Sequence, residues 1–383
     1  MMHSFNFHLP TKIVFGQLAQ EILPDELSAM KARSVLIVSD QGLAELGLVS
    51  QFESFLQSRD IRVVPFTSVT SNPTSDEVEA GTAIAHQAKV EAIVALGGGS
   101  PIDVAKGIAL LLANGGPYTD YLWAGKAISQ RSWPLIAIPT TAGTGSEVSK
   151  VAVVSDKDTP FKKGVLSPLM YPHVAIVDPT LTIGLPPDLT AATGIDTFVH
   201  AFEAYVGRRT NPFSDQLALA GLRSVWKYLL RATKNGDDME ARQEMMLAAL
   251  WGGIAMDQAG LGLVHALSGP LSSHFRLHHG LANVIILPHV VRFNLPAVPI
   301  ARRRNLNKVF GLKSTAGEEA LVEVVIGFLS DLGLPSSLDN VDVSIASGEL
   351  DIVAEETTRM VLIRNNPRPA TQVDCRILLE EMA

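Results

Sequence analysis

An aspartate and a histidine four residues apart carry the clearest chemistry in this sequence. Asp196 and His200 lie in GIDTFVHAFEAY, whose apolar spacing predicts a helix with both side chains on one face. Two more imidazoles follow: His265 lies in a second apolar helical segment, and His279 precedes Gly280 at a predicted turn. An isolated pair at this spacing usually only braces its helix, but the partner histidines favour a metal site. One carboxylate and three imidazoles suit Fe(II) or Zn(II) and not calcium.

A glycine-rich turn indicates a second site, for phosphate. The apolar run AIVAL leads into GGGSPIDVAK, which predicts a buried strand, a turn at Gly97 to Gly99 and a helix with Pro101 at its first position. Without Cβ atoms the backbone lets a pyrophosphate approach the free N–H groups at the helix start. Because Ile102 takes the third glycine position of the pattern G-x-G-x-x-G, a simple tight turn is the alternative.

A loop rich in small hydroxylated residues follows the next predicted strand. The strand PLIAIP opens into TTAGTGSEVS. Its hydroxyl groups, which could hydrogen-bond a ribose, a phosphate or a nicotinamide amide, belong to Thr140, Thr141, Thr144 and Ser146. Two such loops after successive strands predict a dinucleotide site.

The elements that must position these residues fall into two halves. In the first half, buried strands at residues 34–40 and 61–66 alternate with helices at 42–59 and 76–89. After LPPDLTAATGID the strand signals vanish, and helices are predicted at 190–205, 212–233, 241–259 and 261–273. We therefore expect an α/β N-terminal Rossmann-like dinucleotide-binding domain over residues 1–185 and an all-α C-terminal metal-binding domain over residues 186–383.

Composition excludes several classes of protein. The chain has 383 residues, 47% of them hydrophobic and 18% charged, and a net charge of -8 without a basic stripe, so neither nucleic acid nor a membrane is an expected partner. The N-terminus MMHSFNFHLP lacks a signal-peptide pattern, which predicts a cytoplasmic protein. The one cysteine, Cys375, is expected to be a structural thiol whose pKa is raised by Glu380 and Glu381.

Five motifs in order give the chain a family resemblance. They are GGGSPIDVAK, PTTAGTGSEVS, GIDTFVHAFEAY, the HAL at His265 followed by HG at His279, and the NPR at Pro367. Together they resemble the iron-containing (group III) alcohol dehydrogenase family over essentially the whole chain. The resemblance implies hydride transfer between NAD(H) and a small primary or secondary alcohol, aldehyde or ketone, with Fe(2+) as the metal and Zn(2+) as the alternative.

The resemblance also assigns residues. It implies that Asp196, His200, His265 and His279 are the four metal ligands and act in catalysis through the metal. The predicted cofactor-binding set is Asp40, Asn72, Gly98, Gly99, Ser100, Asp103, Thr140, Thr141, Thr144, Ser146 and Lys162. Asp40, which ends the strand SVLIVSD, would bind the adenine ribose hydroxyls and disfavour NADP, while a helix-capping role is the alternative.

One departure and three further alternatives stay open. Members of the family often carry a histidine where this chain has Gly269, which leaves the substrate less defined. A lyase or a hydroxyacid–oxoacid transhydrogenase on the same architecture would retain NAD, and a metal-storing or ligand-sensing protein would have no turnover.

The short strand KIVF, residues 12–15, has no evident hairpin partner in the sequence, and by resemblance it pairs with a second subunit in a homodimer or a higher homo-oligomer.

Overall fold

The computed structural model describes residues 4–17, 19–156, 164–275, 277–341, 343 and 347–382. The chain divides into two compact units. The α/β unit comprises Leu9–Thr141 and Gly145–Ile183. The helical unit comprises Met1–His8, Ala142–Thr144 and Gly184–Ala383.

A parallel sheet of six strands forms the centre of the α/β unit. Its spatial order is β1-β8-β5-β4-β2-β3. The strands are β1 (Lys12–Phe15), β2 (Ser34–Asp40), β3 (Arg62–Val69), β4 (Ala92–Gly97), β5 (Leu135–Pro139) and β8 (Val174–Val177). Strands β4 and β5 are buried throughout, as expected for parallel strands covered on both faces, and this is why they read as continuous apolar runs.

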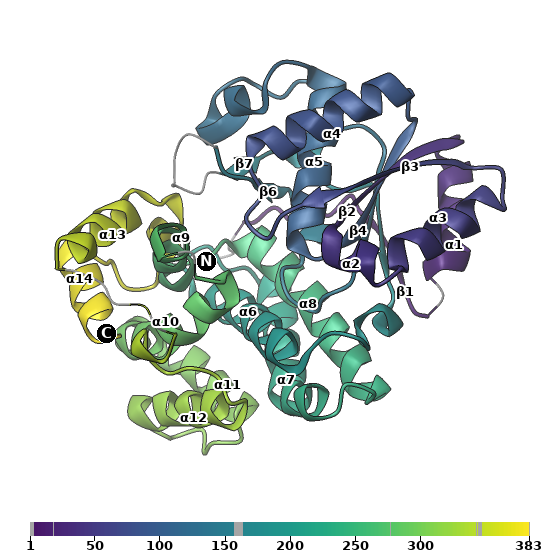
Figure 1. Ribbon diagram of the computed structural model, residues 1–383. Coiled ribbons are helices and arrows are strands. Elements are labelled where there is room, and N and C mark those ends of the chain that lie inside the picture. Colours follow the sequence, from purple (N-terminus) through teal and green to yellow (C-terminus); the bar gives the residue numbers. More distant parts are fainter. Residues whose placement is uncertain are drawn as a thin grey trace. The chain divides into compact units, whose positions relative to one another are not determined.

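Helices cover both faces of this sheet (Figure 1). On one face lie α1 (Ala19–Ala29) and α3 (Leu48–Gln57), and on the other lie α4 (Ser75–Ala88) and α5 (Gly99–Asn114). The chain therefore leaves the neighbouring strands β2 and β4 toward opposite faces. In open α/β sheets, the carboxyl ends of strands at such a point border the crevice that binds a ligand.

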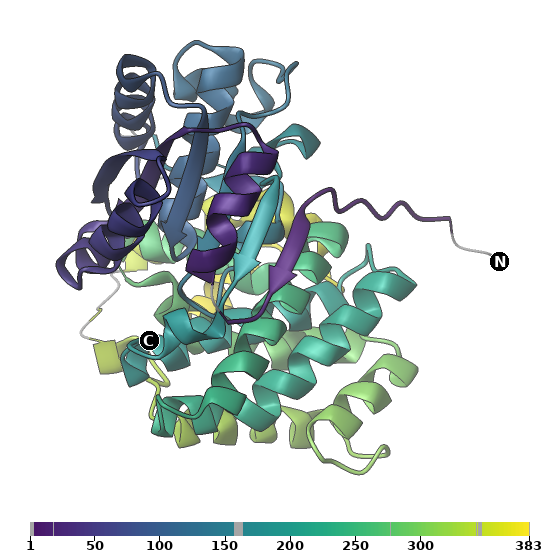
Figure 2. The same cartoon turned by 90° about the vertical axis from the view of Figure 1, so that its right-hand side faces the viewer.

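One helix of this unit differs from the sequence-based prediction. The helix predicted over 42–59 is two helices, α2 (Gln41–Glu45) and α3, because Gly47 adopts a left-handed conformation with φ of 79°. Strand β1 pairs in parallel with β8, which is not a hairpin neighbour, with Lys12 opposite Val174; this pairing does not test the expected contact with a second subunit. Figure 2 shows the purple β1 beside the teal β8 at the edge of the sheet.

Smaller elements complete the unit. Strands β6 (Val151–Val153) and β7 (Gly164–Leu166) form an antiparallel pair. Among the described residues of both units, 3₁₀ segments occupy Tyr118–Ala124, Ser146–Val148, Pro168–Met170, Pro179–Thr182, Leu295–Ala297, Asp339–Val341 and Val361–Asn365. Helix α5 begins at Gly99, so Pro101 is its third residue and not its first; the first turn still tolerates a residue without an N–H group.

The helical unit surrounds one central helix. Helix α6 (Pro187–Val206) is buried along most of its length and packs against α7 (Pro212–Lys234), α8 (Met239–Ala259) and α10 (His279–Asn294). The remaining helices are α9 (Leu263–Phe275), α11 (Ile300–Val309), α12 (Glu318–Asp331), α13 (Ser347–Arg359) and α14 (Gln372–Glu380). A helix buried on nearly every side places its few polar residues where they must pair with one another, and Asp196 and His200 are two of these.

No single helix among the described residues is long and apolar enough to cross a membrane. Helices α8 and α9 together have the length and the apolar composition of a membrane span, but they are bent by 102° relative to each other.

The pKa of the single cysteine is raised for a reason other than the expected one. Cys375 is fully buried in α14, and this burial, with a smaller effect from the neighbouring Asp374, raises the pKa of its thiol to about 12. Glu380 and Glu381 are not among the causes.

Candidate metal and cofactor site

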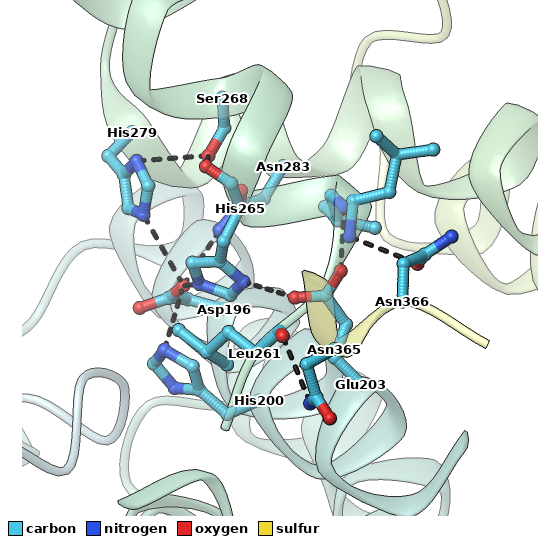
Figure 3. Close-up of polar contacts among 12 residues, drawn as sticks. Asp196, His200, Glu203, Leu261, His265, Ser268, His279, Asn283, Asn365 and Asn366 are labelled. Carbon is cyan, nitrogen blue, oxygen red and sulfur yellow. Dashed lines mark hydrogen bonds and ion pairs between the residues drawn. The ribbon is translucent and has the colours of Figure 1, made fainter. Parts of the chain in front are cut away.

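Three helices of the helical unit bring the four predicted metal ligands together (Figure 3). Asp196 and His200 lie one turn apart on α6, His265 lies in the first turn of α9, and His279 is the first residue of α10. The expected turn at His279 is therefore wrong, because this residue begins a helix. Asp196, His200 and His265 are buried, and about a third of the His279 side chain is exposed.

The ligand atoms converge on one carboxylate oxygen. Oδ1 of Asp196 lies 3.5 Å from Nε2 of His265, 3.7 Å from Nε2 of His200 and 3.9 Å from Nε2 of His279. Ligands about 2.1 Å from a tetrahedrally coordinated ion lie roughly 3.4 Å from one another. These separations are too long for good hydrogen bonds and close to those of atoms that share a cation.

A buried atom without a partner supports the fit. Nε2 of His265 has no hydrogen-bond partner although it is fully buried, and a cation would satisfy it. Asp196, His265 and His279 each place one ligand atom within 4.8 Å of the others, and His200 stacks on His265 with ring centroids 4.8 Å apart. Neutral imidazoles and a carboxylate suit iron or zinc, so the residues present fit the implied metal.

The pKa values of this cluster reflect strong coupling. Burial opposes the charged form of Asp196, but the three imidazoles lower the pKa of its carboxyl below the usual range. Burial also disfavours a charged His265, yet Asp196 and Glu203 raise its pKa to about 9. The pKa of His200 is lowered, mainly by burial, which the neighbouring Asp196 opposes.

Further polar residues surround the four and were missed in the sequence. Glu203 contacts Nδ1 of His265 at 2.7 Å, Asn283 donates to Oδ1 of Asp196 at 2.8 Å, and Ser268 lies 3.5 Å from Nδ1 of His279. Helical spacing contained the signal: Glu203 follows His200 by three residues, and Asn283 follows His279 by four, so each lies on the ligand's face.

The predicted cofactor residues of the α/β unit lie at one edge of its sheet. Asp40 ends β2, Asn72 follows β3, Gly98 to Ser100 follow β4, and Thr140 and Thr141 follow β5. All of these strands are parallel, so the residues share the carboxyl edge, where adjacent segments also contact each other. The amide of Thr140 donates to the carbonyl of Gly97 at 3.0 Å, and Ser100 Oγ donates to the carbonyl of Ser71 at 3.0 Å.

The glycine-rich turn leaves little space for side chains at Gly97 and Gly98. Gly97 has φ of 151°, and an added Cβ would lie 2.6 Å from the ring of Pro101. A Cβ on Gly98 would come within 3.3 Å of the hydroxyl of Thr141. Bare backbone therefore faces the start of α5, which fits the phosphates of a dinucleotide.

Two predicted cofactor residues are engaged with each other. Ser146 donates to Asp103 at 2.5 Å, and the fully buried Lys106 donates to Ser146 at 2.7 Å and lies 3.6 Å from Asp103. Asp103 also accepts from the amide of Val153 at 2.8 Å. This network ties the hydroxylated loop to α5, so Asp103 and Ser146 have a structural role whether or not they contact a cofactor.

The other predicted residues have diverse surroundings. Asp40 caps α2, because its Oδ1 accepts from the amide of Leu43 at 2.9 Å, so the capping role is confirmed. Lys162 lies outside the described residues. Thr144 belongs to the helical unit, where Thr197 donates to the carbonyls of Ala142 and Gly143 just before it. A Cβ on Gly269 would meet only the end of the Met360 side chain, at 3.4 Å.

Comparison with known proteins agrees with this geometry. The family model described as iron-containing alcohol dehydrogenase matches residues 10–179, and that of the C-terminal domain of the Fe-containing alcohol dehydrogenase family matches residues 190–383. The chain belongs to the iron-containing alcohol dehydrogenase family. This membership confirms the resemblance, the fold class and the expectation of an oxidoreductase.

Relatives of this family resemble the chain along its whole length. The NAD-dependent methanol dehydrogenase of Bacillus methanolicus is 34% identical over 374 residues, which are 96% of this chain and 97% of that protein. The 4-hydroxybutyrate dehydrogenase of Cupriavidus necator is 36% identical over 371 residues, which are 95% of this chain and 96% of that protein. Among solved structures, a 1,3-propanediol oxidoreductase superposes with a TM-score of 0.94 at 30% identity, covering 100% of both chains.

Proposed function

We propose that this iron-containing alcohol dehydrogenase transfers hydride between NAD(H) and a small primary or secondary alcohol or its carbonyl product. The ligand cluster around Asp196 carries the proposal, because four side chains from three helices converge there and the buried Nε2 of His265, which faces Asp196, lacks a hydrogen-bond partner. Relatives named for methanol, 1,3-propanediol and 4-hydroxybutyrate support small alcohols as substrates, and one named as NAD-dependent supports the cofactor.

Each part of the chain has a proposed task. Residues 186–383 would hold the metal through Asp196, His200, His265 and His279. Residues 1–185 would bind NAD through the carboxyl edge of the sheet, with Gly98, Gly99 and Ser100 at the phosphates, Asp40 at the ribose, and Asn72, Thr140 and Thr141 beside them. Asp103, Thr144, Ser146 and Lys162 complete the proposed cofactor set.

The chemistry divides between the bound groups and the protein. A divalent cation supplies a Lewis acid for the substrate oxygen, and NAD supplies the hydride acceptor. The protein orients the ligands: Asn283 holds Oδ1 of Asp196, and burial of Asp196, His200 and His265 keeps competing water away from them. His279 is the most exposed of the four.

A panel of alcohols and aldehydes tests this proposal. Protein loaded with iron or with zinc should form NADH in proportion to the alcohol consumed, and chelated protein should not. A lyase or a transhydrogenase would hold its NAD without net release of NADH. The comparisons do not favour that alternative, because the relatives named above are dehydrogenases.

Assembly and location complete the proposal. We propose a homodimer formed through β1, which is the terminal strand of the sheet and pairs with β8 along one edge only. Solution scattering at micromolar concentration would show twice the mass of the chain, and a monomer would contradict the dimer. We also propose a cytoplasmic location, which cell fractionation tests.

A further inference from the structure

Helix α9, which carries His265, begins without a capping side chain of its own. It starts at Leu263 after Gly262, and the first N–H groups of a helix have no partner within it. Two distant side chains accept them. Oδ1 of Asn366 accepts from the amide of Leu263 at 3.1 Å, and Oε1 of Glu203 accepts from the amide of Val264 at 2.6 Å. We call Glu203 and Asn366 the α9 clamp.

Glu203 also fixes the ring of His265. Its second oxygen lies 2.7 Å from Nδ1 of His265, and the carboxylate is almost completely buried. An ionised carboxylate only accepts hydrogen bonds, so Nδ1 must carry a hydrogen and donate it. Nε2 is then the ring nitrogen available to a cation, and it is the nitrogen that faces Asp196 without a hydrogen-bond partner.

Asn366 holds the other side of the helix start. Its Oδ1 also accepts from Nδ2 of Asn294 at 2.9 Å, and its own Nδ2 donates to Oδ1 of Asn294 at 2.6 Å and to the carbonyl of Arg368 at 2.7 Å. The neighbouring Asn365 donates to the carbonyl of Leu261 at 3.1 Å (Figure 3). Asn365 and Asn366, at the start of the NPR motif, thus both hydrogen-bond the backbone just before His265.

The two members of the clamp meet at Gly262. A Cβ on this residue would lie 3.0 Å from Oδ1 of Asn366 and 3.0 Å from Oε1 of Glu203. A side chain at this position would therefore push Glu203 and Asn366 away from the helix start by a few tenths of an ångström.

We infer that Glu203 is a positioning residue for the metal site, and that it works with Asn366 to set the orientation and the tautomer of His265. The inference rests on the proposed metal site and adds residues that do not touch the metal. Side chains that orient a metal-binding histidine in this way typically change metal affinity roughly ten- to a hundred-fold when they are replaced.

Glu203→Gln is the sharpest test, because glutamine has the same size but a single acceptor oxygen. Its single oxygen cannot replace both carboxylate oxygens, which accept from the amide of Val264 and from Nδ1 of His265. The NH₂ group of the glutamine must then either face one of these N–H donors or donate to Nδ1, in which case the hydrogen of the His265 ring moves to Nε2. Co²⁺ titrated into the full-length, metal-free protein, followed by the visible absorption of the bound ion, should show affinity lowered roughly ten- to a hundred-fold and an altered spectrum.

A matched carboxylate serves as the control. Asp215 on α7 accepts from Arg302 at 2.6 and 2.7 Å, in the same unit but outside the ligand cluster. Asp215→Asn should lower the unfolding temperature and leave Co²⁺ affinity unchanged. Equal losses of affinity in both variants would show a general effect of destabilisation and overturn the inference.

The remaining outcomes separate the two proposals. Wild-type affinity and spectrum in a folded Glu203→Gln protein would overturn the inference alone. A wild-type protein that binds no Co²⁺ at this cluster would overturn the proposed metal site itself. If Glu203→Gln does not fold, Gly262→Ala is the second variant; its Cβ should push the clamp apart and lower Co²⁺ affinity by a smaller factor, and unchanged affinity there would also refute the inference.

Discussion

A buried glutamate within the hydroxylated loop should make the stability of the α/β unit depend on pH. Glu147 lies in the 3₁₀ segment Ser146–Val148 and is 3% exposed. Burial raises the pKa of its carboxyl to about 7, although its own amide and the ammonium group of Lys106 oppose the rise. The folded protein therefore keeps this proton at pH values where the unfolded chain has already lost it.

The sign and the size of the effect follow from this difference. The ordinary pKa of the group is 4.5, so the free energy of unfolding should fall as pH rises from about 4.5 to about 7. The difference corresponds to about 3 kcal/mol above neutral pH and to less than about 1 kcal/mol near pH 5. Glu147→Gln removes this titration and should stabilise the protein increasingly as pH rises.

Denaturant unfolding of wild type and Glu147→Gln between about pH 5 and pH 8 measures this difference. Tryptophan fluorescence and circular dichroism report the transition. Glu45 is exposed on α2 in the same unit, so Glu45→Gln serves as the control for removing a carboxylate at the surface. A stability difference for Glu147→Gln that is flat over this range, or that shrinks with rising pH, would refute the reasoning.

Three further predictions concern the cofactor, the metal and the thiol. Asp40→Asn keeps the oxygen that caps α2 but removes the charge, so the preference for NAD over NADP should fall roughly ten- to a hundred-fold, measured as the ratio of kcat/KM values; an unchanged ratio would leave Asp40 only its capping role. His279→Ala should fold with a wild-type circular dichroism spectrum and lose its bound metal and nearly all turnover; undiminished metal content by elemental analysis would remove this residue from the site. Because the pKa of Cys375 is raised to about 12, the native protein should resist a thiol reagent near pH 8 and react only after unfolding, and rapid labelling of the native protein would contradict its burial.

Much of the fold was readable in the sequence because local patterns and tertiary environment agree. The run SVLIVSD is the strand Ser34–Asp40, and the helix predicted at 212–233 is α7, Pro212–Lys234, since strong apolar periodicity and helix-start residues coincide there. The break at Gly47 was missed because a single glycine within an amphipathic pattern does not reveal its φ. The pairing of β1 with β8 joins residues about 160 positions apart, and no local pattern contains that contact.

In the candidate site, too, contacts between residues far apart in the sequence could not be predicted. Its four proposed ligands could be predicted, because each lies in a motif whose residue types suggest chemistry. Helical spacing places Glu203 on the face of the ligands, but the contacts that Glu203 and Asn366 make with the start of α9 could not be predicted, because only the packed structure brings them to Leu263 and Val264. The Lys106 network was hidden for a similar reason, since its partners come from a loop about 40 residues downstream.

The most direct test of the proposed function follows a labelled hydrogen. Iron-loaded protein is mixed with NAD and a small primary alcohol deuterated at its carbinol carbon, and the product nicotinamide is examined by NMR. Direct hydride transfer predicts deuterium at C4 of the reduced nicotinamide, in an amount equal to the aldehyde formed, and no reaction after chelation. Unlabelled NADH, or aldehyde without reduced cofactor, would contradict the proposal.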